Sequence, residues 1–390
     1  MIGTAAVVAF PVAGTVPAAA DRAARLSALT LGISLPGDTV LYLLLPLHAA
    51  VFGVSLPEAG LLLAANRLVR IAGYGWVARG YERYGARRTC LIAAVAAAGS
   101  TLGYAVLTGV WWLLLARLLW GLSFAALNIA TQALITAEAT GASRRSGRAR
   151  AVISGGPMLG LLAGAALAEV AGPRIVFLLL ALIALAAIPV AWRLPAGRGD
   201  AVRLVRRRLT VPSPLDVWSF VQGLTMDGVF VIGLAVLAAA TMPEGAGLAA
   251  GAALALRYAA EMALGPPSGA VAERWGATRS LVLLSLGAAA GLAAIAAGAM
   301  WSGVVAIVLL RGMLAPLGAP VAAAANPGPQ RVPAIARLAT WRDLGAGVGP
   351  LLAGVLLPLA PLALHFAAAV LLILATLPLA ASRIDRWRGG

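Results

Sequence analysis

One stretch of eight residues recurs in similar form in this chain: Tyr81-Glu82-Arg83-Tyr84-Gly85-Ala86-Arg87-Arg88 and, 191 residues later, Ala272-Glu273-Arg274-Trp275-Gly276-Ala277-Thr278-Arg279. Other landmarks recur at nearly the same spacing, namely Asp38 with Asp227, Arg117 with Arg311, and Gly156-Pro157 with Gly349-Pro350. A chain of two equivalent and strongly apolar halves is typical of proteins whose halves move about a central site in a membrane. The repeat therefore predicts the organisation of the whole chain.

The composition indicates that lipid is the solvent of this chain. Hydrophobic residues make up 61% of it and charged residues 11%, whereas about 25% of the residues in a soluble domain are charged. The formal charge is +16, but no soluble module is present to offer this charge to nucleic acid, so we expect no nucleic-acid binding. With Cys90 as the single cysteine, no intramolecular disulfide and no cysteine-based metal site can form.

Twelve apolar segments are long enough to cross a bilayer, which takes about 20 residues in a helix. Because helices satisfy their own backbone groups in lipid, we expect an all-α membrane protein with twelve transmembrane helices in two pseudo-symmetric six-helix bundles. The expected spans are 28–51, 59–78, 89–108, 111–136, 151–170, 175–192, 214–240, 247–271, 280–299, 303–325, 339–358 and 361–381. We expect an N-terminal half at 1–192 with a loose tail at 1–27, a basic linker at 193–213, and a C-terminal half at 214–390.

Arginine is distributed unevenly over the connections between these spans. The connections 79–88 and 144–150 each contain four arginines, whereas the loops on the opposite side contain only Arg174. Loops rich in arginine stay in the cytoplasm. We therefore expect a multi-pass protein of the bacterial inner membrane with both termini and the linker in the cytoplasm.

The repeated stretch resembles the cytoplasmic loop motif of the major facilitator superfamily, Gly-x-x-x-Asp-Arg-x-Gly-Arg-Arg. The second copy has Glu273 in place of the Asp, and the first copy has Ala78 in place of the leading Gly. Arg117-x-x-x-Gly121 resembles the arginine motif of span 4, and Gly156-Pro157-x-x-Gly160 resembles the antiporter motif of span 5, although Leu161 replaces its second Gly. The resemblance covers all twelve spans and implies alternating access, as in the branch that exchanges drugs or metabolites for protons.

The repeated loop has a physical rationale of its own. A carboxylate at a helix end, followed by arginines across a glycine turn, can form charge-assisted pairs with neighbouring helix ends. We predict that such pairs latch the cytoplasmic side closed, and a solvated positive loop is the alternative. The predicted latch residues are Glu82, Arg83, Gly85, Arg87, Arg88, Glu273, Arg274, Gly276 and Arg279.

Spans 5 and 11 each contain a proline flanked by glycines. Proline kinks a membrane helix, and glycine permits another helix to approach closely. We predict that Gly156, Pro157, Gly160, Gly349 and Pro350 lie where the two halves meet, and ordinary helix packing is the alternative.

Ionisable residues within apolar spans are costly and therefore indicate function. Asp38 and Asp227 lie mid-span at equivalent positions, and we predict that they exchange protons, with Arg117 as their coupling partner. The alternative for either aspartate is an ion pair that holds helices together. Arg67 and Arg70 are three residues apart, so they share a helix face and need a negative partner.

The deeper parts of the expected spans contain six arginines and four carboxylates. The arginines are Arg67, Arg70, Arg117, Arg257, Arg311 and Arg342, and the carboxylates are Asp38, Asp227, Glu261 and Asp343. This excess of positive charge predicts an anionic substrate that contacts Arg67 or Arg70. Further polar residues near the expected cavity could orient the substrate through hydrogen bonds. The predicted substrate-binding residues are Arg67, Arg70, Tyr42, Asn128, Gln132, Gln222, Arg257, Tyr258, Glu261, Arg311, Arg342 and Asp343.

These observations predict a secondary active transporter. We expect proton-coupled export, by antiport, of a small anionic or amphipathic metabolite or drug, and the alternative is proton-coupled import of an organic anion or siderophore-like compound. A membrane enzyme would need clustered catalytic groups at one membrane face, and a receptor or channel would not need two equivalent mid-span acids. Because the chain has no lysine, the phosphate-binding Gly-x-x-x-x-Gly-Lys motif is absent. We expect no metal and no cofactor, and a monomer in the bilayer whose partners are protons and a small molecule.

Overall fold

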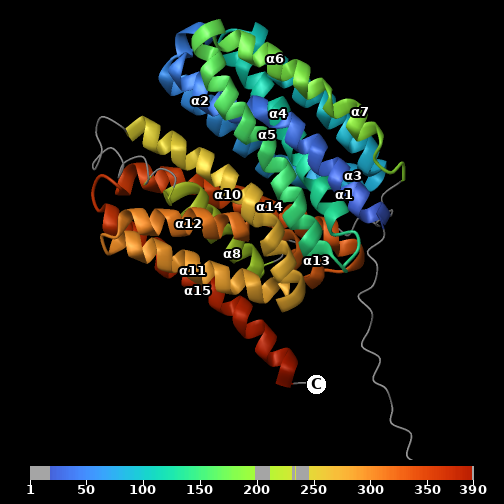
Figure 1. Cartoon of the computed structure of the whole chain (residues 1–390), viewed down its shortest axis with the longest axis vertical. Helices are drawn as coiled ribbons and strands as arrows, with labels where there is room; N and C mark the ends of the chain where they lie inside the picture. The colour runs from blue at the N-terminus through green and yellow to red at the C-terminus, as the bar shows by residue number, and fades with distance from the viewer. Residues whose placement is uncertain (1–17, 198–210, 231–232, 234–245, 389–390) are drawn as a thin grey trace, which may run out of the picture.

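The structure is a computed structural model that describes residues 18–197, 211–230, 233 and 246–388. These residues form helices and connecting turns, with no strand among them. The N-terminal helices group together in one half of the molecule and the C-terminal helices in the other, as Figure 1 shows. The expected tail and linker fall partly outside the described residues, at 1–17 and 198–210.

The N-terminal half contains the six expected spans. Spans 1 and 6 each consist of two helices, which meet at Leu35 and at Ala186, and one long helix contains spans 2 and 3 with a break at Gly85. The helices are α1 (Ala18–Ser34), α2 (Pro36–Leu47), α3 (Leu56–Val106), α4 (Val110–Ile135), α5 (Ala142–Ala171), α6 (Pro173–Leu185) and α7 (Ala187–Trp192), with the short 3-10 helix η1 (Ala49–Phe52). Helix α1 begins at Ala18, so residues 18–27 of the expected loose tail are helical.

The C-terminal half repeats this arrangement. Span 7 contains a π-helical segment, and span 10 consists of two helices bent by 41°. The elements are α8 (Pro214–Gln222), η2 (Gly223–Val229), α10 (Ala246–Trp275), α11 (Ala277–Ala296), α12 (Met300–Leu314), α13 (Gly318–Ala325), η4 (Gly328–Gln330), α14 (Arg331–Leu356) and α15 (Pro361–Arg388).

Length and apolarity single out seven of the described helical stretches as able to cross a membrane, or eight if α12 and α13 form one span. Helix α3 counts once in that number although it contains two spans joined at Gly85. Helices α10 and α14 are not included. Their buried charged residues, which are described below, lower their hydropathy, and such residues in a membrane helix face the bundle interior.

The two copies of the repeated stretch share one backbone feature. Gly85 and Gly276 have φ values of 76° and 93°, in the left-handed region where a side chain is strained. In both halves this glycine reverses the chain direction between two spans. The sequence repeat is therefore also a repeat of backbone conformation.

Two helix pairs provide most of the contact between the halves, α5 with α10 and α3 with α14. In the first pair the backbones touch, because a Cβ atom on Gly147 would collide with the backbone of Gly265, and one on Gly269 with the backbone of Ser143. Small residues allow this kind of close approach in membranes. Figure 1 shows α10 lying along the boundary between the halves.

Further contacts join the halves at one end of the molecule. The Gly141 N–H donates to Glu273 at 2.6 Å, Ser146 Oγ donates to the Pro316 carbonyl at 2.5 Å, and Arg331 donates to the Thr136 carbonyl. These contacts lie at the end formed by the arginine-rich connections near 79–88, 136–150 and 274–279, which we call the basic end. In the described residues, every polar contact between the halves lies between mid-span and this end.

The glycine–proline elements of spans 5 and 11 lie elsewhere than expected. A Cβ atom on Gly160 would lie 2.9 Å from Cβ of Pro36 in α2, and one on Gly349 would lie 2.6 Å from Cα of Gly228 in η2. Both elements therefore pack against the first span of their own half instead of meeting across the halves. A run of small residues shows that some helix approaches closely, but it does not show which helix.

The contact at Gly147 generates a prediction about closure. We expect Gly147→Val to prevent the close approach of α5 and α10 and so to open the basic end. An Ala336→Cys reporter, at a position 5% exposed in α14, should then react several-fold faster with a maleimide, while Cys90 at 0% exposed stays protected.

Gly155→Val is the matched control, because a Cβ atom there would have nothing within 4 Å. Equal labelling rates in the two variants would show that the α5–α10 contact does not hold the basic end closed.

Candidate functional site

Each half contains a buried aspartate–arginine pair at equivalent positions of the repeat. Asp38 accepts a hydrogen bond from Arg117, whose side chain is 0% exposed, and a second from Asn66 at 3.3 Å. Asp227 accepts from Arg311 Nε at 2.9 Å and from Nη2 of the same residue. The first pair joins span 1 to span 4, and the second joins span 7 to span 10.

Both aspartates lie where a helix is irregular. Asp38 is in the first turn of α2, directly after the break at Leu35, where the helix dipole favours a negative charge. Asp227 lies within the π-helix η2, an element that is rare in proteins and common at functional sites. The same position of each half therefore combines a carboxylate with a local departure from α-helical geometry.

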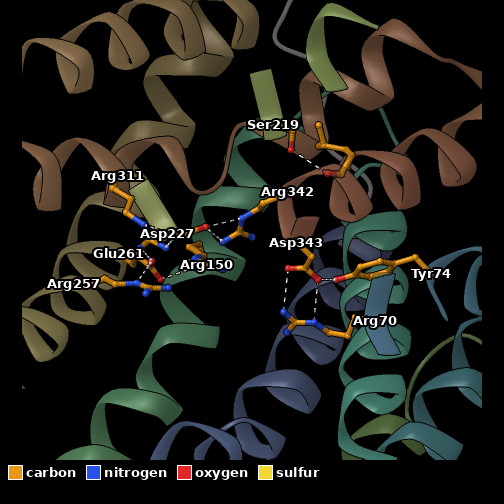
Figure 2. Close-up of polar contacts among 11 residues, drawn as sticks. Arg70, Tyr74, Arg150, Ser219, Asp227, Arg257, Glu261, Arg311, Arg342 and Asp343 are labelled. Atoms are coloured by element: carbon orange, nitrogen blue, oxygen red, sulfur yellow. Dashed lines mark hydrogen bonds and ion pairs between the residues drawn. The ribbon is translucent and has the colours of Figure 1, made fainter. Parts of the chain in front are cut away.

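The aspartate of the C-terminal half belongs to a larger group of charges, drawn in Figure 2. Arg342 Nη2 lies 3.1 Å from Asp227 Oδ2, and Arg311 Nη1 lies 2.8 Å from Glu261 Oε1. Arg311 therefore bridges two carboxylates from different spans. We call this group the Asp227–Glu261 cluster, and its members are Asp227, Glu261, Arg150, Arg257, Arg311 and Arg342.

The cluster crosses the boundary between the halves. Arg150 Nη2 lies 2.8 Å from Glu261 Oε2, and Ser154 Oγ donates to the same oxygen at 2.8 Å. The sequence prediction counted Arg150 among the loop arginines and did not select Ser154. A signal was present, because Gly147, Arg150 and Ser154 recur at helical spacing and share one face of α5. Within the helix, Arg257 Nε lies 3.5 Å from Glu261, as the i, i+4 spacing suggested.

A second ion pair joins the halves between α3 and α14. Arg70 donates to Asp343 from Nη2 at 3.0 Å and approaches it with Nε at 2.9 Å, while the Tyr74 hydroxyl donates to the same carboxylate at 2.8 Å. Arg70 is therefore neutralised within the protein, contrary to the expectation that it awaits an anion. Arg67 is partly buried and has no ion pair among the described residues.

A cavity of about 80 Å³ lies between α4 of one half and α8, α12, α13 and α14 of the other. The Oε1 atom of Gln132, one of its lining residues, is buried without a hydrogen-bond partner in the described part of the chain. Of the predicted substrate-binding residues, the cavity brings together Asn128, Gln132, Gln222, Arg311 and Arg342.

The other predicted substrate-binding residues do not line this cavity. Tyr42 and Tyr258 each lie against an arginine instead, with Arg117 and Arg257 5.3 Å from the respective ring centroids. Arg70 and Asp343 pair with each other across the halves, and Arg257 and Glu261 belong to the Asp227–Glu261 cluster. The predicted set thus divides between one cavity and the ion pairs around it.

The two copies of the latch motif have different environments. Glu273 accepts the Gly141 N–H from the other half, whereas Glu82 Oε1 is buried and unpartnered among the described residues. Burial raises the pKa of the Glu82 carboxyl above its usual range. Arg87 Nε donates to the Leu194 carbonyl at 2.7 Å within its own half. For Arg88, Arg274 and Arg279 the described residues provide no ion pair.

Two further observations limit the chemistry of the site. Asp216, at the start of span 7, is 2% exposed, caps α8 together with Ser213 and lies 2.8 Å from Arg337. Its role is thus to hold the start of span 7. The described residues contain no group of three or more His, Cys, Asp or Glu side chains suited to a metal ion.

Comparison with known proteins agrees with this architecture. The family model described as the Major Facilitator Superfamily matches residues 27–242, more than half of the chain. The solved structure of the human organic anion transporter MFSD10 (TETRAN) is similar in fold, with a TM-score of 0.75 and 16% sequence identity over 94% of this chain and 100% of that chain. No curated protein matches the sequence. The chain belongs to the Major Facilitator Superfamily, and it is a multi-pass membrane protein and secondary transporter of a small molecule, without enzymatic activity.

Proposed function

We propose that this protein exports a small anionic or amphipathic compound in exchange for protons. The observation that supports this most is the Asp227–Glu261 cluster, in which carboxylates and arginines meet at the boundary between two moving halves. Carboxylates can hold or release protons, and arginines can bind an anion. A site with both groups can release protons when it binds an anion, or bind protons when it releases the anion.

The arginines support an anionic substrate. Arg342 lines the cavity and has a side chain that is 41% exposed, so an incoming anion can reach it. Arg342 also binds Asp227, so an anion and this carboxylate compete for one guanidinium. The similarity in fold to a human organic anion transporter is compatible with this substrate class. The resemblance of Gly156-Pro157 to the antiporter motif favours exchange over import.

Proton exchange follows from the same competition. A carboxylate in a low-dielectric site keeps its charge while a guanidinium is bound to it, and it takes up a proton more readily when that guanidinium leaves. In our proposal, Asp38 and Asp227 undergo this change during the transport cycle. Each alternates between an ion pair, with Arg117 or Arg311 respectively, and a protonated state without that pair. Substrate binding at Arg342 would then be coupled to protonation.

Alternating access requires contacts between the halves that can separate. We propose that Arg150–Glu261, Arg70–Asp343 and Glu273–Gly141 close the basic end in the present conformation and break when that end opens. We place the basic end in the cytoplasm because arginine-rich loops remain there. The described conformation would then be closed to the cytoplasm.

The function is tested with purified protein in liposomes under an imposed pH gradient, with the lumen buffered to report proton movement. Export by antiport predicts that flux of an organic anion in one direction is matched by proton flux in the other. Movement of both in the same direction would instead support the import alternative. Flux of the anion without proton movement would contradict proton coupling in either form.

Asp38 allows its structural and proton-carrying roles to be separated. We expect Asp38→Asn to destabilise the protein by ~3–5 kcal/mol, because Arg117 is left buried without its partner. The double variant Asp38→Asn with Arg117→Met removes both charges, so it should regain much of this stability in a denaturation measurement. If the pair exchanges protons, the stable double variant still loses the response of transport to the pH gradient.

Glu169→Gln is the matched control, because Glu169 is exposed near the end of α5. A double variant with the wild-type response to pH would assign the Asp38–Arg117 pair a purely structural role.

Asp343 allows the closure of the basic end to be tested on the α3–α14 side. We expect Asp343→Asn to weaken the contacts with Arg70 and Tyr74 and so to raise the maleimide reactivity of an Ala336→Cys reporter several-fold. Glu169→Gln again serves as the control. Unchanged reactivity in Asp343→Asn would show that this ion pair does not hold the end closed.

A further inference from the structure

The Asp227–Glu261 cluster contains more positive than negative charge. Its four arginines face two carboxylates, which leaves a net charge of +2 inside the membrane-spanning region. Arginine stays protonated in proteins, so this charge cannot be removed by loss of protons. Uncompensated charge within a bilayer is costly. The surplus therefore requires a counter-ion that the cluster itself does not provide.

The unused hydrogen-bond donors show which arginines could hold that counter-ion. Arg311 directs Nε, Nη1 and Nη2 to carboxylates. Among the described residues, Arg342 uses Nε and Nη2, both toward Asp227, whereas Arg257 uses only Nε, at 3.5 Å from Glu261. Because a guanidinium offers five N–H donors, Arg257 and Arg342 retain terminal donors for a ligand.

Among the three arginines that the C-terminal half contributes, exposure selects the same two residues, whereas Arg150 from the other half is 21% exposed and has a buried Nε. The side chain of Arg311 is 4% exposed, whereas those of Arg257 and Arg342 are 23% and 41% exposed. Arg257 and Arg342 belong to one cluster, because Arg311 bridges their carboxylate partners Glu261 and Asp227. The open side of the cluster thus presents two guanidinium groups that are partly free.

From these observations we propose that the substrate is a small dianion, a dicarboxylate or a phosphate monoester, held between Arg257 and Arg342. This inference rests on the proposed transport of an anion and narrows its class. A dianion neutralises the +2 charge, while a monoanion of the same size would leave one positive charge uncompensated. Each guanidinium can bind a carboxylate or phosphate with two parallel hydrogen bonds.

The test compares dianions with monoanions of nearly equal size on the purified full-length protein. Succinate and glutarate are compared with their monomethyl esters, and phenyl phosphate with diphenyl phosphate, by the concentration dependence of thermal stabilisation. We expect at least one dianion to bind about tenfold more tightly than its monoanionic counterpart, the effect of one ion-paired contact of about 1.4 kcal/mol. The two series also distinguish a dicarboxylate from a phosphate monoester.

Two variants locate the site. We expect Arg257→Gln and Arg342→Gln each to reduce the affinity for the dianion to that for the monoanion, with little change in monoanion binding. Arg257→Lys keeps the charge and should retain part of the preference. Arg148→Gln, at a side chain 61% exposed near the basic end, is the matched control and should behave as the wild type.

The outcomes separate this inference from the proposed function. Equal affinity for dianions and monoanions would overturn the dianion inference and leave anion transport intact. A dianion preference that persists in both Arg→Gln variants would overturn the placement between Arg257 and Arg342. Transport of cations alone in the liposome assay, with no binding of any anion, would overturn both proposals.

Discussion

A fully buried arginine in a membrane protein requires a negative partner, and this one constraint organises the spans of the chain. Asp38 with Arg117 fixes span 1 to span 4, and Asp227 with Arg311 fixes span 7 to span 10. These two pairs lie within the halves. Arg150–Glu261 and Arg70–Asp343 satisfy the same requirement across the boundary between the halves. The same chemistry therefore both builds each half and holds the two halves together.

The arginines of the two kinds of pair differ in their access to solvent, although their carboxylates do not, with Asp38 12%, Asp343 11% and Glu261 0% exposed. Arg117 and Arg311, within the halves, have side chains that are 0% and 4% exposed, whereas Arg70 and Arg150, which reach across, are 10% and 21% exposed. Breaking a fully buried pair leaves a charge without water or partner, at a cost of ~3–5 kcal/mol. A pair that water can reach separates at lower cost. The gradient of exposure thus fits halves that stay intact while the contacts between them open and close.

The sequence predicted those features that depend on repetition and hydropathy. The internal repeat identified the equivalence of Asp38 with Asp227 and of Gly85 with Gly276, and the structure shows equivalent ion pairs and equivalent positive φ angles. Hydropathy located the spans, because lipid requires about 20 apolar residues in each. These properties are local in the chain or are repeated along it, so a single sequence contains them.

The sequence alone could not predict which residues far apart in the chain form ion pairs or pack against each other. Arg70 and Asp343 are 273 residues apart, and nothing near Arg70 indicates that its charge is already neutralised. The excess positive charge lies around Asp227 and Glu261, and not at Arg70, where the sequence had predicted a contact with an anionic substrate. Gly160 shows the same limit, because its lack of a side chain indicates a close neighbour without showing that the neighbour is Pro36.

The adjacent residues Arg342 and Asp343 connect the proposed anion-binding cavity to the ion pair between the halves. Successive side chains on an α-helix point about 100° apart, so Arg342 reaches Asp227 and the cavity while Asp343 reaches Arg70 and Tyr74 of the other half. Because both belong to one helical turn of α14, a rotation or shift of this helix moves both contacts together. An anion that draws Arg342 away from Asp227 therefore acts on the same backbone that holds the α3–α14 contact. In the proposed cycle, a single turn of helix would thus link binding in the cavity to separation of the halves.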